Sequence, residues 1–155
     1  LFAVLPPALL TYGNVDVPSL WPRFLRPGHV VLDGDSIDIG GLRMGFVGGG
    51  LVSPMRTPYE RTPADFAASL ARLGPVDILF THIPAANPGL MYDTVARRFE
   101  SGSRAIVDYI DAHRPALHLY GHVHQPLRER WRHRSTECMN VGHFAGRRRP
   151  FVIDL

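Results

Sequence analysis

The feature that most constrains the fold is a layout that occurs three times: a short apolar run is followed at once by a polar segment that contains glycine or proline. The apolar runs are residues 8–12, 76–80 and 116–120. The polar segments are residues 13–16, 81–84 and 121–124. Short apolar runs bounded by turn residues are typical of buried β-strands. Ligands of open α/β sheets bind beyond the carboxyl ends of the strands, so we expect the three polar segments to converge there.

Two helices are predicted between these strands. Thr62 is a suitable N-cap, Pro63 fits the first helical position, and Asp65 stands at the capping-box offset. We expect this helix to end at Gly74. A second helix is predicted from about residue 103 to just before residue 115, with three apolar side chains on one face: Ile106, Tyr109 and Ile110.

The rest of the chain has β character and no linker. Turn signals at residues 33–34 and 40–41 divide residues 30–47 into strands. We expect a hairpin and a closing strand toward the end of the chain, at residues 127–133, 136–141 and 151–155. The sequence therefore predicts one domain over residues 1–155, of the α/β (α+β) class, in which a mixed sheet system has helices on its flanks.

The positive charge of the chain is a weak indication of a nucleic-acid partner. The net charge is +3, and all seventeen Lys+Arg positions are Arg, which is typical of GC-rich coding bias. Four alternating arginines would share one face of a strand: Arg128, Arg130, Arg132 and Arg134. A charged edge strand is the favoured interpretation of this pattern, and nucleic-acid binding is the less favoured one.

Cysteine content and hydropathy bear on the compartment. Cys138 is the one cysteine, which excludes an internal disulfide and favours a reducing environment. No apolar run is long enough to cross a membrane. The opening residues 1–5 have no basic flank and are interrupted by prolines, unlike a signal peptide. We therefore expect a cytoplasmic protein with no membrane partner.

The three polar segments contain five side chains that suit a metal site: Asn14, Asp16, His82, His122 and His124. A carboxamide, a carboxylate and three imidazoles fit a divalent ion such as Mn, Fe, Zn or Ni. Two histidines separated by one residue on a loop can be directed at two adjacent ions. Taken alone, the Asn and Asp segment could be a turn, and the two-histidine segment could be an ordinary loop. Their shared placement after buried strands favours a metal site.

These segments, in this order, resemble the last three motifs of the calcineurin-like metallophosphoesterases: Gly13-Asn14-Val15-Asp16, then residues 77–82 with Pro84, then Tyr120-Gly121-His122-Val123-His124. The resemblance implies a four-layer sandwich of two mixed sheets with helices outside. It also implies two divalent metal ions that act on phosphomonoesters or phosphodiesters. By this resemblance, Asn14, His82 and His122 are ligands of one ion, and His124 is a ligand of the other.

The first two motifs of that family do not occur before Gly13. They are Asp-x-His and Gly-Asp-x-x-Asp, each at the end of a βα unit, so we expect roughly 60 or more further residues upstream. Those residues would supply the bridging carboxylate and most of the second metal site. A Gly-Asp-x-x-Asp pattern does occur at residues 34–38, but it follows Asn14 and overlaps an Asp-Gly turn signal. We interpret it as part of a hairpin.

A second departure concerns the leaving group. Val15 stands where many family members carry a histidine that is thought to protonate it, whereas Asp16, which would orient that histidine, is present. His143, after the predicted hairpin, is a candidate for this proton transfer, and the alternative is an ordinary surface histidine.

The resemblance thus implies a phosphoesterase whose substrate class, nucleotides included, is open, and whose isolated fragment is inactive. Two alternatives remain: a non-catalytic scaffold with the same fold, and a module that binds nucleic acid or phosphate. A scaffold has no physical need for the four predicted metal ligands. The sequence does not indicate an oligomeric state.

Overall fold

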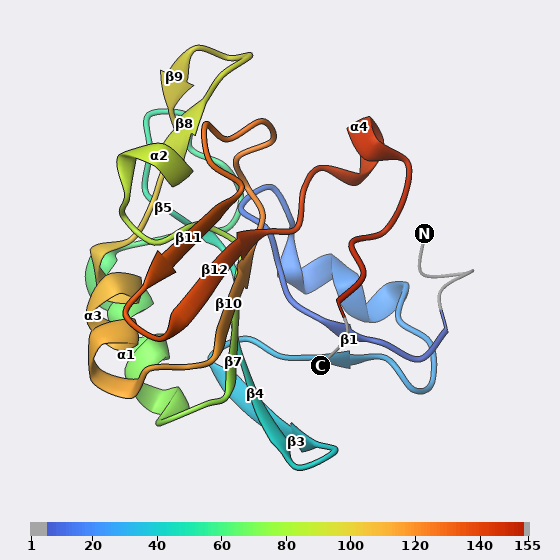
Figure 1. The fold of residues 1–155 in the computed structure, drawn as a ribbon. Coiled ribbons are helices and arrows are strands. Elements are labelled where there is room, and N and C mark those ends of the chain that lie inside the picture. Colours follow the sequence, from blue (N-terminus) through green and yellow to red (C-terminus); the bar gives the residue numbers. More distant parts are fainter. Residues whose placement is uncertain (1–5, 154–155) are drawn as a thin grey trace.

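A computed structural model describes residues 6–153 of the chain. Its centre is a six-stranded mixed sheet with the strand order β11-β12-β10-β7-β4-β3 (Figure 1). The four inner strands run parallel, and the strand at each edge pairs antiparallel with its neighbour. The strands are β3 (Asp35–Ile39), β4 (Leu42–Val47), β7 (Ile78–Thr81), β10 (Leu117–Tyr120), β11 (Arg130–His133) and β12 (Thr136–Asn140). The predicted α/β (α+β) class is confirmed.

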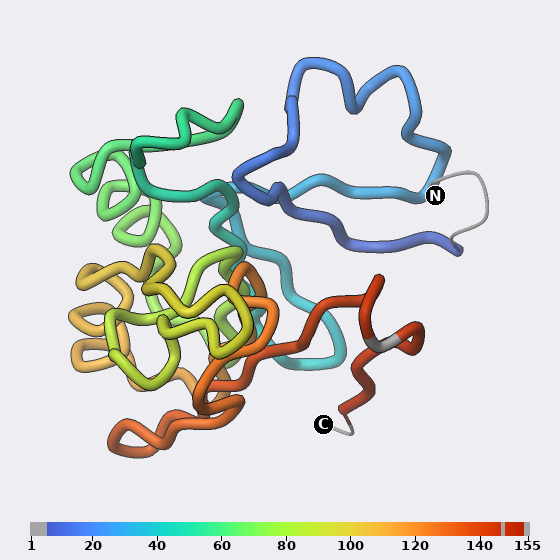
Figure 2. The backbone as a smooth tube through the Cα atoms, turned by 90° about the horizontal axis from the view of Figure 1, so that it is seen from above, coloured from blue at the N-terminus to red at the C-terminus, as the bar shows by residue number. Residues whose placement is uncertain are grey.

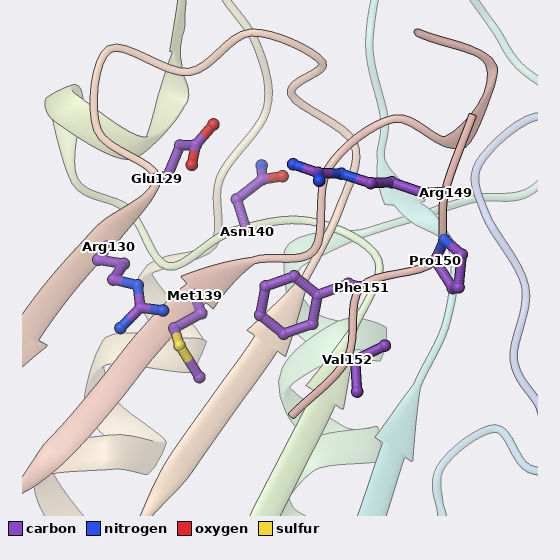
Figure 3. A pocket seen from close by; sticks show the side chains of 8 residues that line it. All are labelled: Glu129, Arg130, Met139, Asn140, Arg149, Pro150, Phe151 and Val152. Carbon is purple, nitrogen blue, oxygen red and sulfur yellow. The ribbon is translucent and has the colours of Figure 1, made fainter. Parts of the chain in front are cut away.

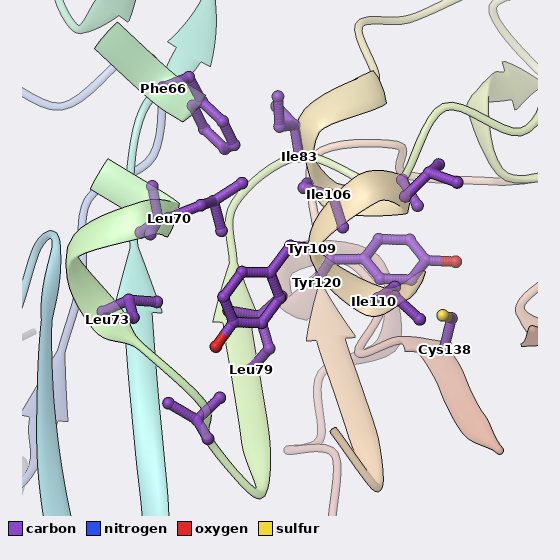
Figure 4. Close-up of a cluster of buried hydrophobic side chains, with 14 of the residues drawn as sticks. Phe66, Leu70, Leu73, Leu79, Ile83, Ile106, Tyr109, Ile110, Tyr120 and Cys138 are labelled. Carbon is purple, nitrogen blue, oxygen red and sulfur yellow. The ribbon is translucent and has the colours of Figure 1, made fainter. Parts of the chain in front are cut away.

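Helices α1 (Pro63–Leu73) and α3 (Arg104–His113) cover one face of the sheet (Figures 1 and 4), and both confirm the sequence prediction. α1 begins where the side chain of Thr62 accepts a hydrogen bond from Asp65 N at 3.1 Å. It ends at Gly74, whose φ of 62° suits glycine. None of the helices formed by residues 6–153 is long and apolar enough to span a bilayer.

The main core lies between these helices and the sheet. Side chains alternate along each strand, so Leu79 of β7 and Tyr120 of β10 point toward the helices, whereas Ile78 and Leu119 point to the opposite face. Figure 4 shows Phe66 of α1 among the buried side chains, and it is fully buried. Truncation of a buried Phe to Ala costs about 3–5 kcal/mol, so this layer stabilises the sheet that positions the site.

The opposite face of the sheet carries a second apolar cluster centred on Ile78, Leu119 and Met139. Phe151 packs on this cluster, and Figure 3 shows it above the strands beside Met139. The predicted closing strand at residues 151–155 is therefore wrong for residues 151–153, which form no strand, and residues 154 and 155 lie outside the described residues. Phe151 and Ile153 pack on a sheet face, and the backbone of residues 151–153 does not pair with an edge strand.

Residues 6–32 lie beside the sheet (Figures 1 and 2). There β1 (Leu9–Leu10) pairs in parallel with β2 (Val30–Val31), and the 3-10 helix η1 (Pro18–Arg23) lies between them in sequence. The predicted strand at residues 8–12 is thus confirmed for two residues, and it pairs outside the main sheet. The other short elements are β5 (Gly50–Leu51), β6 (Glu60–Arg61), α2 (Pro88–Met91), β8 (Tyr92–Asp93), β9 (Arg98–Phe99) and α4 (Phe144–Arg147).

One edge strand, β11, carries two of the four arginines of the predicted stripe. Arg130 and Arg132 are exposed on it, but Arg134 lies in the turn that follows, with φ of 54°. Arg130 pairs with Glu137 on the neighbouring strand at 3.1 Å, and Arg134 pairs with Asp111. The predicted common face is therefore wrong for Arg128, which precedes the strand, and for Arg134, because the hairpin turns there. Charge on an exposed edge discourages pairing with other chains, which favours the edge-strand interpretation.

The other edge strand, β3, contains most of the Gly-Asp-x-x-Asp pattern. Asp33 and Gly34, whose φ is 77°, form a bend before β3, so the turn of the hairpin is at Gly40 and Gly41 and not at the predicted Asp-Gly signal. Asp35 and Asp38 are exposed in the strand. The interpretation of residues 34–38 as part of a hairpin is confirmed, with the correction that both Asp residues belong to its strand. Within residues 6–153, no three His, Cys, Asp or Glu side chains are grouped as a metal site. The pattern therefore contributes no such group.

Candidate metal centre

Two of the three polar segments leave the sheet side by side. β7 and β10 are neighbouring parallel strands, and Thr81 lies opposite Tyr120 in their register. His82, the residue after β7, is held on both sides through its backbone. Its N–H donates to Val47 O at 3.3 Å, and its carbonyl accepts from Gly121 N at 3.0 Å. The backbone of His82 is therefore fixed between the ends of two strands, next to the segment that carries His122.

The third segment reaches the same place from outside the main sheet. Tyr12 O accepts a hydrogen bond from Gly49 N at 2.9 Å, and Asn14 O accepts one from the N–H of Tyr59 at 2.8 Å. A Cβ atom on Gly50 would lie 2.8 Å from the Cβ of Asn14, which is too close for two carbon atoms. Glycine at position 50 therefore lets the two loops approach each other.

The side chains of Asn14, His82 and His122 meet at this point. Asn14 Oδ1 lies 2.9 Å from His82 Nε2, and His122 Nδ1 lies 3.2 Å from the same nitrogen. The two imidazole rings are 5.0 Å apart and inclined at 71°. We call these three residues the Asn-His-His trio.

The trio brings lone pairs together with too few protons to link them. Asn14 Oδ1 only accepts hydrogen bonds, and the amide nitrogen of Asn14 donates elsewhere, to Thr57 Oγ1 at 3.0 Å. If His82 Nε2 carries a proton, that one proton must serve both Asn14 Oδ1 and His122 Nδ1. If His82 Nε2 carries no proton, it can accept one from His122 Nδ1, but its lone pair then points at the lone pairs of Asn14 Oδ1. A bound cation would accept electron density from all three atoms at once.

Burial favours the neutral form of both histidines. Burial, followed by the nearby imidazoles of His122 and His124, lowers the pKa of His82 to about 3. Burial also lowers the pKa of His122. A histidine binds a metal ion only in its neutral form, so both side chains are available as ligands near neutral pH.

The loop that carries His122 is strained and well supported. His122 has a φ of 66°, in the left-handed region that most side chains avoid, a conformation that costs of the order of 1–3 kcal/mol. The buried amide of Asn140 supports the loop by donating to Val123 O at 2.9 Å and to Gly121 O at 3.4 Å. The Nε2 atom of His122 is buried and has no hydrogen-bond partner within the described residues. The Nδ1 atom of His122 is the one that faces His82.

The other predicted site residues lie outside the trio. His124 is exposed, and its ring stacks on the ring of His143 with centroids 3.9 Å apart and 5° between the planes. Asp16 turns back on its own segment, where its Oδ2 accepts from Gly13 N at 2.6 Å. The structure thus joins His124 and His143 as a pair and leaves Asp16 in a turn. The catalytic roles of Asp16 and His143 stay predictions.

Cavities of about 340 and 400 Å³ adjoin the trio, and both have Asn14 and His122 in their walls. Arg98 and Glu100 also contribute to both walls and form an ion pair at 2.7 Å. A larger cavity of about 560 Å³ lies over the sheet face that α1 and α3 do not cover (Figure 3), and none of the predicted site residues lines it.

Sequence reasoning missed Thr57 and Glu60, which lie directly behind the trio. Thr57 contacts the Asn14 amide and itself donates to Glu60 Oε1 at 2.9 Å. The available signal was the Thr-x-x-Glu spacing at residues 57–60, a pattern that satisfies backbone donors at helix starts and here closes a turn. No local signal marks Arg98 or Glu100.

No family model and no curated protein matches the sequence. Solved structures do resemble the fold. One superposes with a TM-score of 0.66 at 16% identity, over 90% of this chain and 58% of its own. TT1561 of Thermus thermophilus has a TM-score of 0.58 at 16% identity, over 88% of this chain and 63% of its own. This chain therefore spans less than two thirds of either structure, and the likeness concerns the fold alone.

Proposed function

We propose that the chain carries part of a binuclear metal centre that hydrolyses a phosphoester, as the resemblance to the calcineurin-like metallophosphoesterases implies. The supporting observation is the meeting of Asn14 Oδ1, His82 Nε2 and His122 Nδ1. These atoms come from segments 68 and 40 residues apart, so their proximity is a product of the fold.

The spacing of the trio fits one divalent ion. Ligand atoms that lie roughly 2.0–2.2 Å from a common ion are about 2.8–3.6 Å apart, from octahedral to tetrahedral bond angles. The separations of 2.9 and 3.2 Å lie within that range. Two imidazoles and a carboxamide suit Mn, Fe, Zn or Ni. All three ligands are neutral, so the positive charge of the ion would have to be offset by carboxylates or by an anionic substrate.

His124 is the proposed ligand of the second ion. The resemblance assigns the remaining ligands, including the bridging carboxylate, to the two motifs that do not occur before Gly13. The intact site is therefore a proposal about a longer protein. The proposed four-layer sandwich would also bring a second sheet onto the apolar face centred on Ile78, Leu119 and Met139.

When bound, the two ions would supply activated water and stabilisation of phosphoryl charge. The residues of this chain would hold the ions and orient the ligand atoms. The trio offers neutral lone pairs from a half-buried position, and the strained loop at His122 directs its Nδ1. Val15 is 67% exposed, and its apolar side chain cannot transfer a proton. The ring of His143, stacked on His124, is our candidate proton donor to the leaving oxygen.

The test is hydrolysis of bis(p-nitrophenyl) phosphate by the full-length protein with Mn²⁺. His122→Ala should lower the rate by about a hundredfold or more. His133→Ala is the matched control, because His133 pairs with Asp111 at 2.8 Å on the β11 hairpin and should leave the rate unchanged. Equal effects of both changes would contradict the assignment. A wild type that neither binds metal nor hydrolyses the substrate would favour the scaffold alternative, and a wild type that is active without bound metal would point to another chemistry.

A further inference from the structure

We propose that Thr57 and Glu60 are positioning residues that fix which end of the Asn14 amide faces the metal site. This inference rests on the proposed function and adds two residues that the resemblance does not assign. It is carried by a chain of hydrogen bonds whose direction is forced by chemistry: Asn14 Nδ2 to Thr57 Oγ1 at 3.0 Å, and Thr57 Oγ1 to Glu60 Oε1 at 2.9 Å.

Glu60 sets the donor-to-acceptor direction of these hydrogen bonds. Its carboxylate receives four hydrogen bonds, from the backbone N–H and the hydroxyl of both Ser53 and Thr57, at 2.7 to 3.1 Å. The hydroxyl of Ser53, followed by the N–H of Thr57, lowers the pKa of Glu60 to about 2. An ionised carboxylate only accepts hydrogen bonds. Each group that contacts Glu60 must therefore act as the donor.

Thr57 in turn determines which end of the Asn14 amide it can bind. A threonine hydroxyl has one proton, and here Glu60 takes it. Toward Asn14 the hydroxyl oxygen can therefore only accept, so the NH₂ end of the amide must face it. The amide oxygen is then left on the side of His82, 2.9 Å from Nε2. A flipped amide would present N–H groups to the ion and could not bind it.

The backbone keeps this arrangement in place. Tyr59, inside the turn between Thr57 and Glu60, donates its N–H to Asn14 O at 2.8 Å. The same turn therefore holds Asn14 by its main chain and its side chain. Groups that hold a metal ligand from behind are worth about 10–100-fold in metal affinity in other proteins, because they orient the ligand and increase its basicity.

The experiment is a calorimetric titration of the protein with Mn²⁺ and Zn²⁺. Thr57→Val removes the acceptor for the amide at similar volume, and we expect about tenfold weaker binding or more. Thr57→Ser keeps the hydroxyl and should bind within about threefold of wild type, a rescue that bulk alone does not explain. Glu60→Gln can place an NH₂ group toward Thr57. The Thr57 hydroxyl could then donate to Asn14, the amide would no longer be held in one orientation, and metal binding should also weaken.

Ser53→Ala is the matched control. It removes a hydrogen bond of 2.7 Å from the same carboxylate and leaves the link from Thr57 to Asn14 intact. The metal-free unfolding midpoints of Ser53→Ala and Thr57→Val should fall to a similar extent, whereas metal affinity should fall only in the latter. Wild-type affinity in both Thr57→Val and Glu60→Gln, or equal losses in Thr57→Val and Ser53→Ala, would overturn the positioning role alone. A wild-type protein that binds no ion would overturn the proposed function as well.

Discussion

Asn14 Oδ1 lies 2.9 Å from Nε2 of His82, although 68 residues separate them in the sequence. The two residues arrive by different routes. His82 follows a central strand of the main sheet, and Asn14 lies on a loop from the segment beside that sheet. The contact is therefore sensitive to anything that moves this loop.

Gly50 provides a direct test of the loop contact. In Gly50→Ala the new Cβ would lie 2.8 Å from the Cβ of Asn14, so Asn14 must shift. We expect a loss of about 1–3 kcal/mol in the free energy of unfolding from overpacking, together with weaker metal binding. Gly146→Ala is the control, because its new Cβ would have its nearest contact at 3.6 Å, and chemical denaturation should show little change. A stable Gly50→Ala protein with unchanged metal affinity would contradict the close approach.

The two exposed aspartates of β3 should not contribute to metal binding. We expect Asp35→Ala and Asp38→Ala to retain the wild-type metal content, because both side chains are exposed on an edge strand and belong to no group of metal-ligating side chains within residues 6–153. Elemental analysis of the purified variants measures this. Loss of one metal equivalent in either variant would show that the Gly-Asp-x-x-Asp pattern is a metal motif after all.

His118 should make stability depend on pH. It is fully buried in β10, where its Nε2 lies 2.8 Å from Thr81 Oγ1, and burial lowers its pKa to about 3. Below its unfolded pKa of about 6.5, the unfolded chain binds a proton that the folded chain excludes. The stability from this group is complete above that pH and is lost as the pH falls toward 3, by about 1.4 kcal/mol per unit.

The measurement is urea unfolding of the metal-free protein between pH 6 and pH 4. We expect His118→Gln, which keeps a donor for Thr81, to show a shallower fall in stability than wild type. His113→Gln, at an exposed position on α3, should match wild type. Identical slopes in His118→Gln and wild type would mean that His118 is protonated in the folded state or is not buried.

Local chemistry explains which elements could be predicted. The cap at Thr62 and the stop at Gly74 are interactions between near neighbours, so α1 could be located from sequence. His82 and His122 follow strand signals and therefore meet. The route by which Asn14 approaches depends on pairing between distant backbones. The Thr-x-x-Glu spacing indicates the turn at residues 57–60, but the contact of Thr57 with Asn14 depends on that approach and has no local signature. Residues 151–153 have the apolar pattern of a strand, but their backbone does not join the sheet.

The central claim is that Asn14, His82 and His122 hold one divalent ion, and titration of residues 1–155 with Mn²⁺ and Zn²⁺ tests it most directly. We predict at most one bound equivalent, weak because all three ligands are neutral, and no phosphodiester hydrolysis. Binding should disappear in Asn14→Ala and in His122→Ala and persist in His133→Ala. Two tight equivalents with turnover, or binding that is indifferent to Asn14 and His122, would contradict the claim.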